Sequence, residues 1–226
     1  MSERPLPSQI ARHLSQVLQE GAATPSRVRL TQRGDMVQKP GGRRLEFTAV
    51  EELEVGTVGF EWRAGFGPNP LVRVRVLDRY RNGEGLLVAK VWGLIPATRS
   101  AGADADRAEA MRYLAELPWV PQAMRSNPEL SWRELEDGSV EVSTLVGGRA
   151  ASVRFTVDEA GLVRSARGIR PRLAGRTSVE TPFLGTFGEY VELGGVRVPG
   201  SAEMSWELPE GPFTYWRGEV TSLVAE

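Results

Sequence analysis

Cysteine is absent from the 226 residues, which excludes disulfides, thiolate nucleophiles and thiolate metal ligands. Histidine occurs once, at His13, so neither a Ser-His-Asp triad nor a histidine-rich zinc site is expected. The formal net charge is -1, which leaves no excess of positive charge to neutralise phosphates. No glycine-rich fingerprint opens a helix as dinucleotide binding requires. We therefore expect no metal, no cofactor and no nucleic-acid partner.

Long hydrophobic runs are absent as well. No stretch approaches the roughly 20 apolar residues of a transmembrane helix, so we expect no membrane span. The first seven residues, Met-Ser-Glu-Arg-Pro-Leu-Pro, lack the apolar run of a signal peptide. These features predict a cytoplasmic protein.

Two segments carry apolar residues at helical spacing. Residues 8–20 place Ile10, Leu14 and Val17 on one face, between a proline and a glycine. Residues 104–117 also carry apolar residues on one side of a predicted helix, which Pro118 ends. A short second turn extends this helical segment to about residue 125. The sequence predicts an N-terminal helix and a central helical insertion.

Elsewhere apolar residues alternate with polar ones, which is typical of antiparallel strands with one buried face. Phe60, Trp62, Val74 and Phe155 are expected to face inward. The residues expected to face water are Glu61, Arg63, Arg73, Arg75 and Arg154. Turn signals such as Asn82-Gly83 separate roughly a dozen candidate strands.

A sheet this wide with one apolar face must curl or pair with a second sheet, and two helices cannot cover it flat. We expect a mainly β (α+β) fold, with a large curved antiparallel sheet forming a half-barrel and helices over its concave side. A closed barrel or a sandwich is the alternative. No linker-like stretch divides the chain, so residues 1–226 are expected to form one domain.

Four segments, residues 78–85, 112–121, 187–199 and 215–218, resemble motifs of an uncharacterised bacterial family, a domain of unknown function, over nearly the full length. More distantly, the tyrosine, hairpin and Gly-Val-Arg-Val-Pro pattern resembles the lipoprotein-carrier (LolA-like) fold. That resemblance implies a half-barrel enclosing an apolar cavity for acyl chains. Carriers of this kind are exported, whereas no export signal is seen here.

The central helix carries the candidate polar site. Arg112 and Glu116 lie four residues apart and therefore share a helix face, with Tyr113 and Trp119 nearby. A buried carboxylate held by an arginine can orient a ligand or act as general acid or base. A surface ion pair is the alternative interpretation.

Asp78 and Tyr80 share a strand face, where they either serve the site or shape the following hairpin. Phe60, Trp62 and Trp92 either line a cavity or pack in the core. The sequence supports a protein that binds an apolar or lipid-like small molecule. The alternative is a cofactor-independent enzyme, of cyclase, isomerase or hydrolase type, that uses Glu116, Tyr80 and Asp78 in the same cavity.

The inward assignment predicts unequal costs for two neighbouring substitutions. Phe60→Ala should lower the free energy of unfolding by ~3–5 kcal/mol because it removes a buried ring, whereas Glu61→Ala should cost little. Thermal and denaturant unfolding of both variants measure this difference. Equal, small effects would show that the strand faces the other way.

Overall fold

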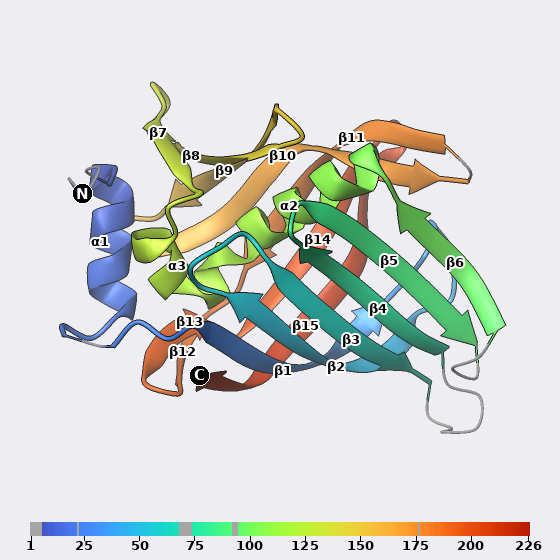
Figure 1. Ribbon diagram of the computed structural model, residues 1–226, viewed down its shortest axis with the longest axis horizontal. Helices are drawn as coiled ribbons and strands as arrows, with labels where there is room; N and C mark the ends of the chain where they lie inside the picture. The colour runs from blue at the N-terminus through green and yellow to red at the C-terminus, as the bar shows by residue number, and fades with distance from the viewer. Residues whose placement is uncertain (1–5, 22, 68–73, 92–94, 176) are drawn as a thin grey trace.

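The computed structural model describes residues 6–21, 23–67, 74–91, 95–175 and 177–226. Side-chain burial is not described for 91 and 95–97. The helical segments are α1 (Ser8–Val17), α2 (Ala103–Glu116), the 3-10 turn η2 (Leu117–Trp119) and α3 (Pro121–Ser126). All other regular elements of the described chain are strands (Figure 1).

Thirteen strands form one antiparallel sheet, in the order β6-β5-β4-β3-β2-β1-β15-β14-β11-β10-β9-β8-β7. The last strand of the chain lies in the middle, paired with β1, so the first six strands extend to one side and the later strands to the other. The strands are β1 (Arg27–Met36), β2 (Leu45–Glu54), β3 (Phe60–Phe66), β4 (Val74–Arg81), β5 (Glu84–Val91), β6 (Ile95–Ala101), β7 (Ser131–Glu134), β8 (Val140–Val146), β9 (Arg149–Val157), β10 (Val163–Ala174), β11 (Thr177–Phe187), β14 (Ser201–Leu208) and β15 (Gly211–Ala225). A separate hairpin consists of β12 (Tyr190–Leu193) and β13 (Val196–Pro199).

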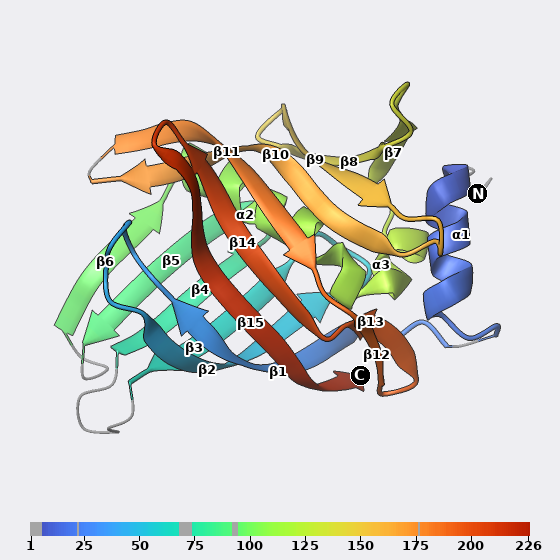
Figure 2. The ribbon, with the colours of Figure 1, turned by 180° about the vertical axis from the view of Figure 1, so that it is seen from behind.

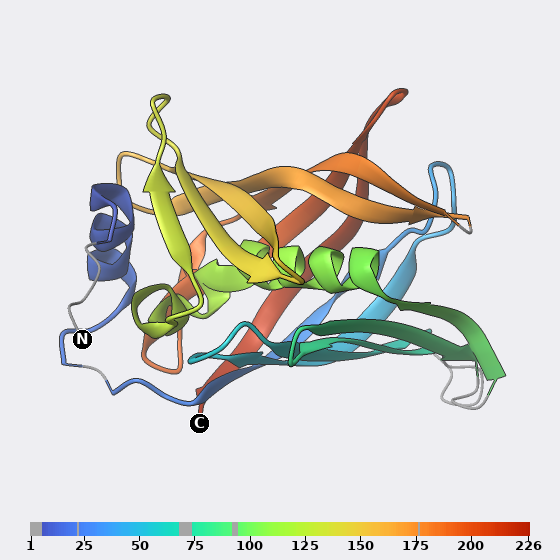
Figure 3. The ribbon, with the colours of Figure 1, turned by 45° about the horizontal axis from the view of Figure 1, so that its top comes forward.

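The sheet curls into a half-barrel around α2. Figure 3 shows this helix between the two halves of the sheet, and α2 contacts β4, β5 and β6 on one side and β8, β9 and β10 on the other. Strands β14 and β15 cross the back and join the halves (Figure 2). Helix α1 lies at one end of the half-barrel, against α3 and β13, rather than within the concavity.

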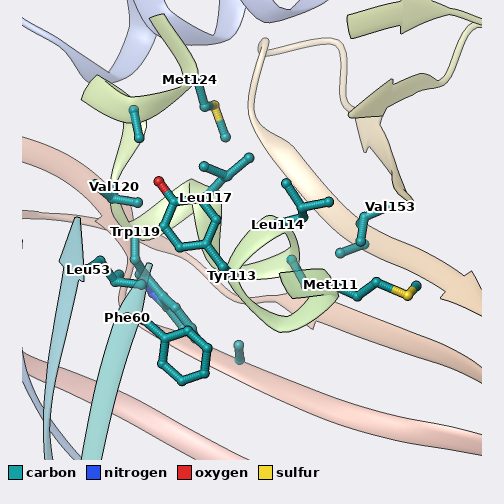
Figure 4. Packing of buried hydrophobic residues seen from close by; sticks show 14 of the residues in the cluster. Leu53, Phe60, Met111, Tyr113, Leu114, Leu117, Trp119, Val120, Met124 and Val153 are labelled. Atoms are coloured by element: carbon teal, nitrogen blue, oxygen red, sulfur yellow. The ribbon is translucent and has the colours of Figure 1, made fainter. Parts of the chain in front are cut away.

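Helix α2 is buried on almost every side, as expected of a helix enclosed by a sheet. Side chains from α2, η2, α3 and the strands converge in one core (Figure 4). Leu114 on α2 and Leu117 on η2 are fully buried, as are Leu53 on β2 and Phe155 on β9. This packing fixes the helix inside the sheet and thereby positions its polar residues.

The structure confirms the half-barrel with an N-terminal and a central helix. Helix α1 is shorter than predicted, because it ends at Val17 rather than residue 20. Helix α2 has the predicted length but begins and ends one residue earlier, at Ala103 and Glu116, so Asp104 lies in its first turn.

The predicted alternation of strand faces is also confirmed where it can be checked. Phe60, Trp62 and Phe155 are buried and Val74 is half-buried. Arg63, Arg75 and Arg154 are exposed, and Glu61 is half-buried. Arg73 lies outside the described residues.

Candidate functional site

A row of inward-facing residues crosses the first half of the sheet. Glu51 on β2 pairs with Trp62 on β3, and Trp62 pairs with Asp78 on β4. Directly opposed residues of antiparallel strands point to the same face. The register therefore brings two carboxyl groups from distant parts of the chain to the concave surface, one on each side of an indole.

Helix α2 meets this row with Arg112, whose guanidinium group binds three carboxylates. Its Nη2 donates to Glu51 Oε1 at 3.0 Å, and its Nη1 donates to Asp78 Oδ2 at 2.5 Å. Its Nε donates to Glu116 Oε1 at 2.9 Å, one helical turn further along. Each of the three guanidinium nitrogens thus has a charged acceptor.

Two aromatic rings contact Arg112, and the side-chain amide of Gln32 contacts Glu51. The Arg112 guanidinium carbon lies 4.7 Å from the centre of the Phe60 ring and 5.1 Å from that of Trp62, which is cation–π geometry. The Trp62 indole N–H donates to Gln32 Oε1 at 2.8 Å, and Gln32 Nε2 donates to Glu51 Oε2 at 2.7 Å. Glu51 is fully buried, and its two carboxyl oxygens accept hydrogen bonds from Arg112 and Gln32.

A second arginine and a fourth carboxylate extend the cluster along α2. Arg170 on β10 donates from Nη2 to Glu109 Oε2 at 3.1 Å and from Nε to the carbonyl oxygen of Ala108 at 2.8 Å. Glu109 lies three residues before Arg112 and is also close to Asp78. The cluster of Glu51, Asp78, Glu109, Glu116, Arg112 and Arg170 therefore joins both halves of the sheet to the helix; this set of six is called the ion cluster below.

Four carboxyl groups against two guanidinium groups make the ion cluster rich in acid, and burial determines which acids keep protons. Burial, followed by the charge of Asp78, raises the pKa of Glu109 to about 8. Burial and then the charge of Glu116 raise the pKa of Glu51 well above its usual range. Glu109 therefore holds its proton at neutral pH, and the pKa of Glu51 is displaced in the same direction.

A cavity of about 450 Å³ opens beside the ion cluster. Asp78, Glu109, Arg112, Glu116 and Arg170 contribute its polar wall. The apolar lining includes Met36, Trp62, Leu87, Ala105, Ala108, Met111, Ala115, Trp119, Phe183, Met204, Trp206, Tyr215 and Trp216. Its size and its largely aromatic and apolar wall are typical of a small-molecule site.

A β-bulge supplies two adjacent aromatic residues to this wall. The register of β14 and β15 shifts between Met204 and Ser205, so Tyr215 has no directly opposed partner and both Tyr215 and Trp216 line the cavity. The Trp216 indole lies over Gly218, where a Cβ atom would come within 2.2 Å of the ring. Because the bulge interrupts the alternation of strand faces, the sequence pattern does not predict that Tyr215 faces the cavity. Residues 215–218 nevertheless form one of the segments that resemble a family motif.

Several residues predicted from the sequence meet at this cavity. Asp78, Arg112, Glu116, Trp62 and Trp119 all line it. Asp78 and Glu116 are buried, with 5% and 6% of their surfaces exposed. Trp119 is anchored by its indole N–H, which donates to the carbonyl oxygen of Pro199 at 2.9 Å. Arg170, Glu109 and Glu51 were not singled out from the sequence, since no local spacing connects them to Arg112.

Other predicted residues lie elsewhere. Phe60 supports Arg112 from behind the cavity wall. The Tyr113 hydroxyl donates to the carbonyl oxygen of Glu54 at 2.7 Å and accepts from Asn127, away from the cavity lining. Tyr80 is buried but is not part of the lining, and Trp92 lies outside the described residues.

Two further features of the described residues concern metal binding and membrane-spanning helices. Among the described residues, no group of three or more His, Asp or Glu side chains is arranged to hold a metal ion. No helix within the described ranges is both long and apolar enough to span a membrane.

The proton on Glu109 predicts a pH-dependent stability. Between about pH 4.5 and pH 8 the folded protein keeps a proton here that the unfolded chain releases, so the free energy of unfolding falls as pH rises. Glu51 acts in the same direction. Buried His13, with a pKa lowered to about 4, acts in the opposite direction, but only below its ordinary value of 6.5.

Unfolding measured from about pH 6.5 to 8 should therefore show a smaller loss of stability in Glu109→Gln than in the wild type. Glu159→Gln, at an exposed turn residue, is the control and should keep the wild-type slope. A Glu109→Gln slope identical to that of the wild type would contradict protonation at this residue.

Solved structures with this fold come from several bacteria. A LolA superfamily protein from Nitrosomonas europaea matches with a TM-score of 0.51 and 9% identity, over 99% of this chain and 94% of that one. A DUF1329 family protein from Desulfovibrio piger matches with a TM-score of 0.53 and 9% identity, over 98% and 93%. A domain from Vibrio parahaemolyticus, described as an outer membrane lipoprotein-sorting protein domain, matches with a TM-score of 0.50 and 9% identity, over 89% and 86%.

At this level of identity the likeness establishes the fold, and the half-barrel predicted from the sequence is shared with all three structures. No curated protein matches the sequence. One family model matches residues 4–224, which is nearly the whole chain. The protein therefore belongs to DUF6920, a family of unknown function.

Proposed function

We propose that the protein binds an apolar or lipid-like small molecule in the half-barrel cavity, with the ligand's polar end at the ion cluster. The observation that carries this proposal is the cavity itself, because about 450 Å³ remains open between α2 and the sheet, walled by aromatic and aliphatic side chains. The structurally similar proteins named for the LolA superfamily and for lipoprotein sorting support it as relatives in fold.

The lining favours a ligand that is mostly hydrocarbon or aromatic. Trp206 stacks on Tyr215 with ring centres 5.2 Å apart, and Phe183 meets Trp206 edge to face at 6.5 Å. These rings form a rigid apolar wall opposite α2, where burial of a ligand gains roughly 25 cal/mol per Å² of apolar surface. Five polar side chains of the lining belong to the ion cluster, which is where the polar end of an amphiphile is expected. The polar lining is completed by Ser100, Asp104, Arg172 and Ser178.

Binding of N-phenylnaphthylamine, an uncharged dye that fluoresces in apolar surroundings, tests this proposal. The wild type should bind the dye with saturable fluorescence. Ala108→Phe should weaken binding at least about tenfold, because Ala108 lines the cavity on α2 and a ring there competes for the same volume. Leu145→Phe, on the exposed face of β8, is the matched control and should bind as the wild type does.

An absence of saturable binding by the folded wild type would overturn the proposal. Equal affinities in Ala108→Phe and Leu145→Phe would place the dye elsewhere. Circular dichroism and thermal unfolding confirm that each variant is folded before affinities are compared.

A cofactor-independent enzyme is the second candidate, and the protonated carboxyl of Glu109 favours it. A cavity that holds an acid with a pKa of about 8 beside other carboxyl groups contains groups suited to general acid–base catalysis. Glu116 and Asp78 would accept protons, and Glu109 would donate one.

Native mass spectrometry of the purified protein distinguishes the two functions. A co-purified ligand whose mass stays unchanged on incubation with wild-type protein supports binding alone. Conversion of that ligand by the wild type, reduced about 10²–10⁴-fold in Glu116→Gln as expected for a lost general acid or base, supports the enzyme.

A further inference from the structure

The arginines of the ion cluster already bind acceptors of the protein itself, although each guanidinium group keeps N–H donors that no described bond uses. All three nitrogens of the Arg112 guanidinium donate to carboxylates, and one of its faces lies against Phe60. Arg170 is engaged through Nε and Nη2. An anionic ligand at these arginines would also lie beside the carboxyl groups that surround them, and like charges repel.

The carboxylates, by contrast, have acceptor capacity that no N–H or hydroxyl group in the described chain uses. Asp78 Oδ1 and Glu116 Oε2 are buried and accept no hydrogen bond from such a group. Both residues are more than nine-tenths buried and both line the cavity. Asp78 is a close neighbour of Glu109 and Glu116 is one of Glu51, and each raises the pKa of its neighbour.

We propose that the polar end of the ligand is a protonated amine, received by Asp78 and Glu116, on an apolar body that fills the cavity. This inference rests on the proposed binding function and specifies its ligand class. An ammonium group carries up to three donors and one positive charge, which matches two unused carboxylate oxygens in a cluster with more acids than bases. The arriving charge also favours release of the Glu109 proton.

Arg172 is the third arginine of the lining and does not belong to the ion cluster. It is half-buried on β10, and its Nε donates to the Thr181 hydroxyl at 3.2 Å. The experiment therefore includes an anionic ligand of the same chain length.

Decylamine, decanol and decanoate share one alkyl chain and differ only in the head group, so their competition with N-phenylnaphthylamine isolates head-group recognition. Decylamine should bind at least about tenfold more tightly than decanol, as expected for a charge-assisted hydrogen bond, and decanoate should bind most weakly. Calorimetry in two buffers of different ionisation enthalpy should show proton release with decylamine and none with decanol.

In Glu116→Gln the ratio of decylamine to decanol affinity should fall towards one. Asp78→Asn is the second variant, in case the first does not fold. The exposed control Glu159→Gln should keep the wild-type ratio.

Dye binding with no preference among the three head groups, or with decanoate bound most tightly, overturns the amine and leaves the binding function in place. An unchanged ratio in the folded carboxylate variants also overturns it. Failure to bind the dye and all three ligands overturns the proposed function itself.

Discussion

The buried guanidinium group of Arg112 is the interaction on which the arrangement of the interior depends. A charge removed from water must be paired and hydrogen-bonded, and leaving it without partners costs several kcal/mol. Glu51 and Asp78 supply that pairing from β2 and β4, and Glu116 supplies it from the helix itself. Because Arg112 pairs with carboxyl groups on β2 and β4, these contacts hold helix α2 in its rotation about its own axis, and this rotation decides which residues face the core and which face the cavity.

As a result, one side of α2 packs in the core and the other lines the cavity. On one side, Tyr113 and Leu114 pack into the core, and the Tyr113 hydroxyl is held by Glu54 and Asn127. On the other side, alanine residues at 105, 108 and 115 line the cavity. Short side chains leave room between helix and sheet that longer ones would fill, so the cavity follows from the composition of this helix face as well as from the curvature of the sheet.

The structural relatives share the scaffold over nearly their full lengths at 9% identity. Such divergence is compatible with one fold, because a half-barrel needs alternating strands and a helix to cover them rather than particular side chains. Function resides in the side chains placed on that scaffold. In the proposed function those side chains are the ion cluster and the aromatic lining of the cavity, which includes Tyr215 and Trp216 at the bulge in β15.

The sequence alone determined the strand faces around Phe60, Trp62 and Phe155, the two helices and the Arg112–Glu116 pair, because each follows from a period of two or from spacing along one helix. The half-barrel followed from the number of one-sided strands. Tertiary structure decided that Glu51, Asp78, Glu109 and Arg170 join Arg112, since strand register and sheet curvature bring together residues up to 119 positions apart along the chain. It also decided that Tyr113 faces the core and that Tyr215 faces the cavity. The buried charge of Arg112 sets the rotation of α2, and a one-residue bulge in β15 turns Tyr215 towards the cavity. Both result from packing between distant segments, and no local sequence pattern encodes them.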